Sequence, residues 1–401
     1  MRILVANNFY ADYATGGEGL SAQADVTLLE DHGQEVFFYK RTNNELLKLS
    51  FWKKLLLPFE LTYSHETYNN VTQLLKEFKP DILHVNNYRY IFTPSIFKAA
   101  KDCGVKTVLT LRNYRLISPC QLCCDGMVCE RCIRGGAYRT LWNRCVPLEH
   151  NPVRRAFQLY IYLFVGRKLA FSHDLIDAFI ALTPFAKQRF VMAGIPEKRI
   201  YVRPNFINNS TPKTENNEKK IGAVFIGRLS SEKGVEFLID TWRSVEYPLT
   251  VIGTGPLESR LKRKAVPNVT FTGNLSSEET MDLLGRANFL IFPSVCYETF
   301  GRTIIEAFSL KVPVIASDLG PRKDLIQHGK NGLLFRTLDP EDLKKQIYKI
   351  INNPVLAEEI GAEGERTFLK NYTPEINYQR LIKVYEDVLN DKVDGIDFIS
   401  K

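Results

Sequence analysis

The sequence predicts an α/β protein with two domains, each a parallel sheet covered by helices. Its 401 residues, 45% hydrophobic and 24% charged, suit a soluble globular protein with two domains of ordinary size. Short apolar segments alternate with amphipathic ones through both halves, which is the pattern of repeated β–α units. The polar residues 208–220 (NNSTPKTENNEKK) separate the halves and are expected to form a linker.

The first half, residues 1–207, contains five expected strands. They are residues 2–6, 35–39, 80–86, 105–111 and 177–182, with helices expected over 18–32, 68–78, 95–102 and from Thr183 onward. Ligands of open α/β sheets bind at the carboxyl ends of the strands. His84 and Asn86 are therefore candidate substrate-binding residues, although a lone histidine at a strand end is more often structural.

Paired glycines, Gly16 and Gly17, separate the first strand from the first helix. Glycine allows a backbone to approach a ligand closely, and a helix start adds amide donors. The pattern is not G-x-G-x-x-G, so the dinucleotide fingerprint is absent from its usual place. A plain flexible turn is the alternative.

The second half restarts with a strand over 221–226, followed by Gly227-Arg228 and, five residues after Arg228, by Lys233. Two cations at a glycine-containing turn before a helix can neutralise a diphosphate. Gly253-Thr-Gly255 follows the next strand as a partial dinucleotide fingerprint. The third glycine and the acidic residue expected for ribose binding are missing, which argues against an NAD enzyme.

The most informative segment runs from Glu298 through Phe300, Gly301, Arg302 and Thr303 to Glu306. It follows the apolar strand 289–293, and a helix is expected to begin near Arg302. A strand, a glycine turn and a helix start form an anion site. A nucleotide sugar fits this site, with the diphosphate on the amides and hydroxyls on the two carboxylates. An ordinary surface helix is the alternative.

Six of the eight cysteines lie between Cys120 and Cys145. The two C-x2-C pairs, Cys120 with Cys123 and Cys129 with Cys132, are spaced to bind a structural zinc ion, with Cys145 as a further thiolate. The spacer between the pairs is shorter than in zinc ribbons. An iron–sulfur cluster, a redox pair and a loop without metal therefore remain open.

The net charge of +8 suggests an anionic partner, and no basic stripe points to nucleic acid. The apolar run 156–165 has basic ends, and residues 43–60 are rich in leucine and lysine. Both suit a membrane interface, and buried helices are the alternative. Neither segment is long enough to span a bilayer. The apolar run at the start of the sequence is too short for a signal peptide. We expect a cytoplasmic protein with peripheral contact at the inner membrane face.

The order of these motifs resembles glycosyltransferase family 4, which contains retaining enzymes of the GT-B fold. The resemblance is carried by Gly16-Gly17, Gly227-Arg228 with Lys233-Gly234, Gly253-x-Gly255 and Glu298-x7-Glu306. It implies two Rossmann-like, doubly wound domains facing across a cleft. Residues 1–207 would bind the acceptor, with a cysteine-rich insertion at 118–146 similar to that of a subgroup. Residues 221–373 would bind the nucleotide sugar, and a helix in 374–401 would pack back on the first domain.

The resemblance also implies roles. Arg228 and Lys233 would hold the diphosphate without a catalytic metal, Glu306 the ribose and Glu298 the transferred sugar. Arg112 stands where many relatives carry a sugar-contacting histidine, and Ser118 stands where the subgroup tends to have a cysteine. The implied activity is retaining transfer of a hexosyl or N-acetylhexosaminyl group to a glycan or lipid-linked hydroxyl, in surface polysaccharide or glycolipid assembly. A non-catalytic nucleotide-sugar-binding scaffold is the alternative.

Overall fold

The computed structural model describes residues 1–9, 17–47, 61–89, 91–124, 126–135, 156, 160, 175–207 and 220–398. The chain forms two compact units, and each is described by itself. The first comprises Met1–Cys124, Cys129–Asn205 and Asn377–Lys401, and the second comprises Asp125–Val128 and Phe206–Ile376.

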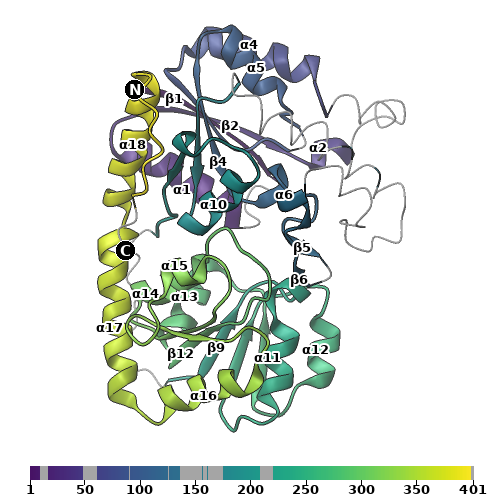
Figure 1. Cartoon of the computed structure of the whole chain (residues 1–401), viewed down its shortest axis with the longest axis vertical. Coiled ribbons are helices and arrows are strands. Elements are labelled where there is room, and N and C mark those ends of the chain that lie inside the picture. The colour runs from purple at the N-terminus through teal and green to yellow at the C-terminus, as the bar shows by residue number, and fades with distance from the viewer. Residues whose placement is uncertain are drawn as a thin grey trace. The chain divides into compact units, whose positions relative to one another are not determined.

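The first unit contains a six-stranded sheet in the order β2-β1-β3-β4-β7-β8 (Figure 1). Its strands are all parallel: β1 (Arg2–Phe9), β2 (Glu35–Thr42), β3 (Ile82–Asn87), β4 (Lys106–Leu111), β7 (Ala178–Ala181) and β8 (Ile200–Val202). Since β1 lies between β2 and β3, the strand order reverses at the β1/β3 boundary. The carboxyl ends of these two strands form the ligand-binding position of a doubly wound sheet.

The helices of the first unit follow the expected local signals. They are α1 (Gly17–Asp31), α2 (Asn44–Leu47), α4 (His65–Phe78), α5 (Ser95–Asp102), α6 (Arg131–Gly135), α10 (Pro184–Met192) and α18 (Pro374–Leu389). Thr183 caps α10 by accepting a hydrogen bond from the Ala186 amide, with Pro184 in the first turn. Two short strands, β5 (Cys123–Cys124) and β6 (Met127–Val128), form a separate two-stranded sheet.

Helix α18 supplies part of the core of the first unit. It begins at Pro374, and its residues from Asn377 onward belong to this unit. Leu381, Val384, Tyr385 and Val388 are buried against the sheet residues Ile3, Val5, Ile82 and Val108. The expected return of the last helix to the first half of the chain is therefore correct.

The second unit contains another six-stranded parallel sheet, in the order β11-β10-β9-β12-β13-β14. The strands are β9 (Ala223–Ile226), β10 (Leu249–Ile252), β11 (Val269–Gly273), β12 (Phe289–Phe292), β13 (Val314–Ser317) and β14 (Leu333–Phe335). Strands β9, β10 and β11 follow one another towards one edge of the sheet, and strands β12, β13 and β14 follow one another towards the other edge. The order thus reverses between β9 and β12, which makes their carboxyl ends the ligand position of this sheet.

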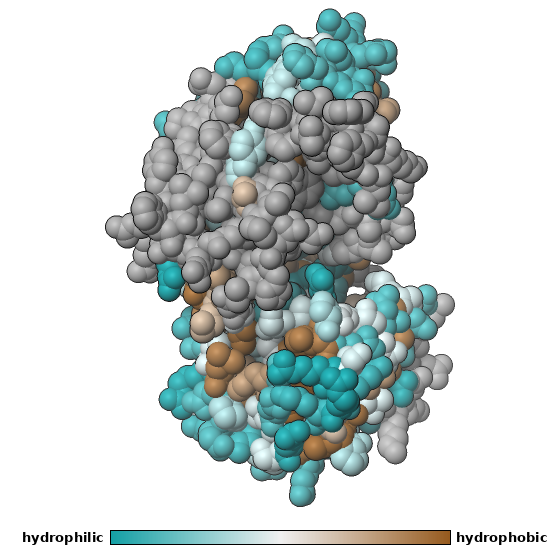
Figure 2. All heavy atoms as spheres, turned by 90° about the vertical axis from the view of Figure 1, so that its right-hand side faces the viewer, coloured by the Kyte–Doolittle hydropathy of each residue, from teal (hydrophilic) through white to brown (hydrophobic). Residues whose placement is uncertain are grey.

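Helices lie on both sides of the second sheet (Figure 1). They are α11 (Val235–Trp242), α12 (Glu258–Lys264), α13 (Ser277–Gly285), α14 (Arg302–Ser309), α15 (Arg322–Leu325), α16 (Pro340–Ile351) and α17 (Pro354–Asn371). Ser276 and Glu279 form the expected capping box of α13. The face that carries α11 and α12 is mostly hydrophilic, with small hydrophobic patches (Figure 2).

Several expectations fall on residues outside the described ranges. These are Gly16, Cys145, residues 48–60 and 208–219, and most of 156–165. Within the described ranges, no helix has both the length and the hydropathy needed to cross a membrane.

Candidate active site

Two of the residues predicted to bind a nucleotide sugar meet at the strand-order reversal of the second sheet. Lys233 ends a short 3-10 turn after β9, and Glu298 lies in the loop after β12. The Lys233 Nζ and Glu298 Oε1 atoms are 2.9 Å apart, and the side chains are 30% and 20% exposed. A cation and a carboxylate are therefore held together where a doubly wound sheet binds ligands.

Glu298 is held as a carboxylate. Burial alone would raise its pKa, but the charge and hydrogen bond of Lys233 outweigh that effect, together with the charge of Arg322 and a hydrogen bond from Ser294. The pKa of Glu298 therefore lies below its ordinary value of 4.5. At neutral pH the side chain accepts hydrogen bonds, as required for binding sugar hydroxyls.

Arg322 supports this site and was not predicted from the sequence. It opens α15 and is fully buried. Its guanidinium donates to three carbonyl oxygens at the ends of β12 and β13: Ser317 at 2.9 Å, Ser294 at 3.0 Å and Cys296 at 3.3 Å. Arg322 thus fixes the loop that carries Glu298. Its position after Gly320-Pro321 was the available signal, but the sequence does not distinguish a buried arginine from an exposed one.

The start of α14, beside Glu298 in the chain, has the features expected of an anion-binding element. Gly301 is the N-cap, with φ of 145°, and no side chain caps the helix. A Cβ on Gly301 would lie 3.0 Å from Ile304 Cδ1, so both backbone and packing favour glycine. The Thr303 hydroxyl oxygen is buried without a hydrogen-bond partner. Uncapped amides at a helix start bind phosphate and similar anions.

The other predicted residues of this segment differ in their surroundings. Arg302 Nε donates to Glu306 Oε1 at 2.8 Å, so these two residues pair along the helix. Phe300 is buried and packs edge-on against Tyr372, with ring centroids 6.1 Å apart. Glu306 keeps a partly exposed carboxylate, whereas Phe300 has a structural role.

The glycine turns after β9 and β10 pack against each other. A Cβ on Gly253 would lie 2.1 Å from the Gly227 carbonyl oxygen, and one on Gly255 would lie 2.5 Å from the Leu229 carbonyl oxygen. The amides of Gly227 and Leu229 donate to carbonyl oxygens of the β10 end at 3.0 and 2.9 Å. Gly253 and Gly255 thus allow the close packing that shapes the turn carrying Arg228. The side chain of Arg228 is exposed.

In the first unit, the predicted site residue Arg112 lies in a buried network. Its guanidinium donates to Asn86 Oδ1 at 2.9 Å, Asn205 Oδ1 at 2.8 Å and Asp25 Oδ2 at 2.7 Å. Arg203 forms a second ion pair with Asp25, at 2.8 Å. All three guanidinium nitrogens of Arg112 are therefore used within the protein. This arrangement argues against the expected catalytic contact with the sugar and indicates a structural role.

The buried network also fixes the charge states of Asp25 and His84. Burial would raise the pKa of Asp25, but Arg203 and Arg112 outweigh it and lower the pKa. His84 is fully buried, and its nitrogens lie 2.7 Å from the Tyr385 hydroxyl and 2.7 Å from Thr110 Oγ1. Burial, together with the two arginines, lowers the pKa of His84 to about 3 despite Asp25. His84 is therefore a neutral structural residue and not the expected substrate ligand.

Cys120, Cys129 and Cys132 form a buried thiol cluster with Ser118. Ser118 Oγ lies 3.4 Å from Cys120 Sγ. Burial raises the pKa of Cys132 to about 11, Ser118 lowers it in part, and the neighbouring Cys120 and Cys129 thiols raise it further. Cys123 is disulfide-bonded and offers no thiolate. Within the described residues, no three His, Cys, Asp or Glu side chains are placed to hold a metal ion.

Two family models match adjacent parts of the chain. The model described as Glycosyltransferase Family 4 matches residues 17–211, and the model described as Glycosyl transferases group 1 matches residues 206–367. The boundary between the two matches falls close to the boundary between the two units. Each match therefore corresponds to one of the two sheets.

Curated relatives are similar over part of their length. An uncharacterized glycosyltransferase of Methanocaldococcus jannaschii is 31% identical over 169 residues, which is 41% of this chain and 48% of the relative. The D-rhamnosyltransferase WbpZ of Pseudomonas aeruginosa is 28% identical over 196 residues, which is 47% of this chain and 50% of the relative. The matches thus span about half the length of these relatives.

Solved structures of similar fold cover nearly the whole chain. HepE of Anabaena in complex with UDP has a TM-score of 0.66 and 18% identity, covering 96% of this chain and 100% of that one. Sucrose-phosphate synthase of Thermosynechococcus elongatus has a TM-score of 0.68 and 16% identity, covering 98% of this chain and 100% of that one.

The two parallel six-stranded sheets and the similarity to these solved structures show the GT-B fold. The chain belongs to glycosyltransferase family 4, because the two models together extend from residue 17 to residue 367. The cysteine subgroup stays a prediction.

Proposed function

We propose that this protein transfers a sugar, with retention of anomeric configuration, from a nucleotide-diphosphate sugar to a hydroxyl of an acceptor. The observation that carries the proposal is the Lys233–Glu298 pair at the β9 and β12 ends, in the segment that leads into the uncapped start of α14. A cation for the diphosphate and a carboxylate for the sugar hydroxyls are the two parts that such a donor requires.

The proposed mechanism depends on stabilising the leaving group. Negative charge builds on the nucleoside diphosphate as the sugar departs, and Arg228, Lys233 and the α14 amides stabilise that charge without a divalent ion. Glu298 binds the sugar hydroxyls, and Glu306 binds the ribose. If the acceptor attacks the face from which the phosphate leaves, the phosphate itself takes the acceptor proton, so no separate base is needed.

The names of similar proteins support a role in glycan assembly. HepE of Anabaena has been solved with UDP and with UDP-glucose. Relatives include an O-antigen chain mannosyltransferase of Escherichia coli, 27% identical over 175 residues, and the capsular polysaccharide biosynthesis glycosyltransferase CapM of Staphylococcus aureus, 25% identical over 209 residues. We propose surface polysaccharide or glycolipid assembly as the setting.

The decisive experiment is a donor screen. Melting temperatures are measured with UDP-, GDP- and ADP-linked sugars, since a ligand that binds only the native state raises the melting temperature. The stabilising donor is then incubated with glycan acceptors, and the anomeric configuration of the product is read by NMR. We expect one nucleotide class to bind and the product to retain the donor configuration. Donor binding with neither transfer nor hydrolysis would instead support the scaffold alternative.

Contact with a cytoplasmic membrane face is a further part of the proposal. It rests on the net charge of +8 and on the basic, apolar segments 46–57 and 156–165. Co-sedimentation with anionic vesicles should occur at low salt and decrease as salt screens the attraction. Absence of binding at low salt would indicate an acceptor free in solution.

A further inference from the structure

We propose that a pocket at the amino ends of β9, β12 and β13 binds a small aromatic carboxylate. The pocket belongs wholly to the second unit. It lies at the opposite end of the strands from Lys233 and Glu298, which follow the carboxyl ends of β9 and β12. Its occupant is therefore a molecule other than the sugar donor, and the proposal does not depend on the proposed transfer.

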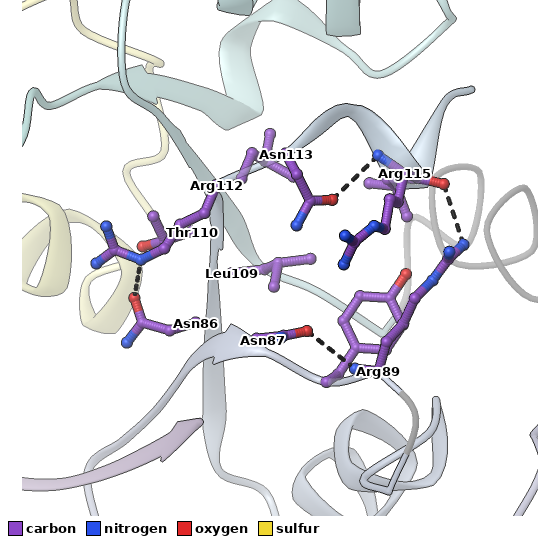
Figure 3. A pocket seen from close by; sticks show the side chains of 11 residues that line it. Asn86, Asn87, Arg89, Leu109, Thr110, Arg112, Asn113 and Arg115 are labelled. Atoms are coloured by element: carbon purple, nitrogen blue, oxygen red, sulfur yellow. Dashed lines mark hydrogen bonds between the residues drawn. The ribbon is translucent and has the colours of Figure 1, made fainter. Parts of the chain in front are cut away.

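The pocket is large enough for a small organic molecule. Its volume is about 240 Å³. A cavity of about 150 Å³ holds benzene, so this pocket has room for a substituted ring or for two fused rings. A second hollow, at the carboxyl ends of β3 and β4 (Figure 3), has a volume of about 20 Å³, which is enough for about one water molecule. Of these two spaces, the pocket of the second unit is therefore the one that can hold a ligand.

Apolar side chains form most of the pocket wall. The strand starts and the corner between α16 and α17 (Figure 1) supply Ala287, Pro313, Ile350, Ile351 and Ala357. Ile350 and Ala287 are buried, whereas Ile351 and Ala357 are partly exposed. A ligand that covers this wall removes apolar surface from water, which favours binding.

Two aromatic residues complete the wall. The rings of Tyr247 and Phe289 are stacked, with centroids 5.7 Å apart and planes inclined by 17°. Phe289 is fully buried, and Tyr247 is partly exposed at the pocket. Aromatic pairs in stacked or edge-to-face geometry gain free energy beyond the burial of their area. The pocket therefore favours a ligand that carries an aromatic ring.

Lys220 gives the pocket its positive charge. Its ammonium group donates to the carbonyl oxygens of Gly285 and Ala287 at 3.3 Å each. An ammonium group has three donors, so one remains for a ligand. Burial lowers the pKa of Lys220, and within the described residues no carboxylate offsets this effect. A bound carboxylate would supply the missing negative charge.

Asn288 and Tyr247 offer further donors to a carboxylate. Asn288 Oδ1 accepts from the Gly222 amide at 3.2 Å. The Asn288 Nδ2 atom and the Tyr247 hydroxyl form no hydrogen bond with the described part of the chain. Burial raises the pKa of Tyr247, so its phenol stays protonated at neutral pH and can donate. An apolar, aromatic wall with a few polar groups of one kind is the usual composition of a small-molecule site.

Two other charged residues line the pocket, Lys311 and Glu358. The Lys311 side chain is 62% exposed, and its ammonium group lies 3.1 Å from Glu365 Oε2, so its charge is shared with that carboxylate. Glu358 is exposed on α17 and does not affect the pKa of Lys220. We therefore expect Lys220 to decide the preference for a carboxylate.

The test measures binding of three probes to the full chain by ligand-observed NMR. The probes are 2-naphthoate, the neutral 2-naphthamide, and octanoate, which has a carboxylate but no ring. We expect naphthoate to bind roughly tenfold more tightly than naphthamide, because a hydrogen bond to a charged group is gained. Naphthoate should also bind more tightly than octanoate, because octanoate cannot stack on an aromatic ring. Equal binding of naphthoate and naphthamide, or octanoate binding as tight as that of naphthoate, would overturn the proposal.

Variants locate the binding site. Lys220→Gln should remove the preference for naphthoate over naphthamide, and Lys220→Arg should retain it. The matched control is Glu358→Gln, which changes one charge in the same pocket and should not weaken naphthoate binding. Ala357→Phe should fill the pocket and abolish binding of both aromatic probes, with melting curves showing that each variant is folded.

Three results would contradict this location. They are a preference that survives Lys220→Gln, probe binding that survives Ala357→Phe in a folded variant, and loss of naphthoate binding in Lys233→Gln, which would place the probe at the donor site. None of these measurements requires turnover, so failure of this proposal is distinguishable from failure of the proposed transfer.

Discussion

At the residue scale, the Lys233–Glu298 pair joins the two side chains that we propose to hold the diphosphate and the sugar of the donor. Lys233 comes from the turn after β9 and Glu298 from the loop after β12, and each fixes the other before a ligand arrives. Preorganised charges of this kind stabilise a transition state without reorganisation during the reaction.

The roles of the two glutamates are separable by mutation. Glu306→Ala should weaken binding of the bare nucleoside diphosphate roughly tenfold, because charged hydrogen bonds to the ribose are lost. Glu298→Ala should leave that affinity unchanged and slow transfer instead. Calorimetric titration and initial rates measure the two effects, with the exposed Glu341→Ala as control. The reverse pattern would exchange the two roles.

Lys233→Ala should reduce both donor affinity and rate, with transfer slower by roughly 10²–10³-fold, as for loss of one preorganised charge donor. The same binding and rate measurements apply. A wild-type rate in this variant would remove Lys233 from the mechanism.

The buried Asp25 is expected to dominate the stability of the first unit. Asp25→Asn leaves Arg112 and Arg203 as uncompensated buried charges, which costs roughly 3–5 kcal/mol of the free energy of unfolding. Urea unfolding measures the loss. The matched control is Asp102→Asn, which removes a solvent-exposed pair with Lys98 and should leave stability unchanged within error. Equal effects of the two variants would contradict the assignment.

Sequence reasoning placed residues at strand ends but could not orient them. Arg112 does follow the end of β4, whereas His84 lies in the middle of β3. Both are buried and bonded to residues far away in the chain, such as Asp25 and Tyr385. The Glu298-x7-Glu306 spacing was more informative, because a turn and a helix start constrain it locally. Arg322 was missed because its partners are backbone carbonyl oxygens, which leave no sequence signal.

At the element scale, the sequence predicts where helix caps and glycine turns occur, but it predicts less well what those turns do in the structure. The caps of α10 and α13 and the start of α14 follow local residue preferences. The sequence presents Gly253 and Gly255 as a partial dinucleotide fingerprint, and in the structure each makes room for the backbone of the neighbouring turn. A close approach between two turns that are distant in sequence cannot be read from one of them alone.

The cysteine cluster gives a prediction for the segment around α6. The thiols Cys120, Cys129 and Cys132 are buried close together, but they are not placed to hold a metal ion as three ligands. The prediction of a zinc ion bound by Cys129, Cys132, Cys145 and one of Cys120, Cys123 or Cys124 therefore requires these thiols to rearrange on binding, and protein purified without chelator should then contain about one zinc ion per chain. Metal analysis tests it: Cys129→Ser should lose the metal and Cys103→Ser should keep it. Less than about a tenth of an equivalent would leave a thiol cluster without metal.

At the scale of the whole molecule, the pH dependence of stability follows from His84. Its native pKa of about 3 lies below the value of about 6.5 in an unfolded chain, so the unfolded state binds the extra proton between these values. The free energy of unfolding should therefore fall as the pH decreases below about 6.5. His84 contributes at most about 1.4 kcal/mol per pH unit to this decrease. The lowered pKa of Asp25 adds a loss at more acidic pH.

Urea unfolding between pH 7.5 and 4.5 measures this slope. His84→Gln removes the titrating group and should flatten the dependence above pH 5. An unchanged slope in the variant would assign the effect to other groups.

The architecture of each unit was largely predictable, because buried parallel strands appear as short apolar runs between amphipathic helices. A helix was expected within residues 374–401, and α18 lies there at Pro374–Leu389. The expected strand ranges differ from the observed ones by a few residues at their ends. The order of strands within each sheet does not follow from local sequence patterns, since the pairing of β9 with both β10 and β12 depends on contacts between distant segments.

The position of α18 has a consequence for biosynthesis. The first unit needs Leu381, Val384 and Tyr385 to cover its sheet, and these residues leave the ribosome only after the whole second sheet has been synthesised. Domains usually finish folding from the amino terminus onward. Here the order is inverted: the second unit can be complete while the first still exposes an uncovered apolar face to chaperones. Ribosome-arrested chains ending at residue 376 should therefore resist protease within residues 220–376 and be cut within the first unit. Full protection of the first unit in such chains would contradict this order.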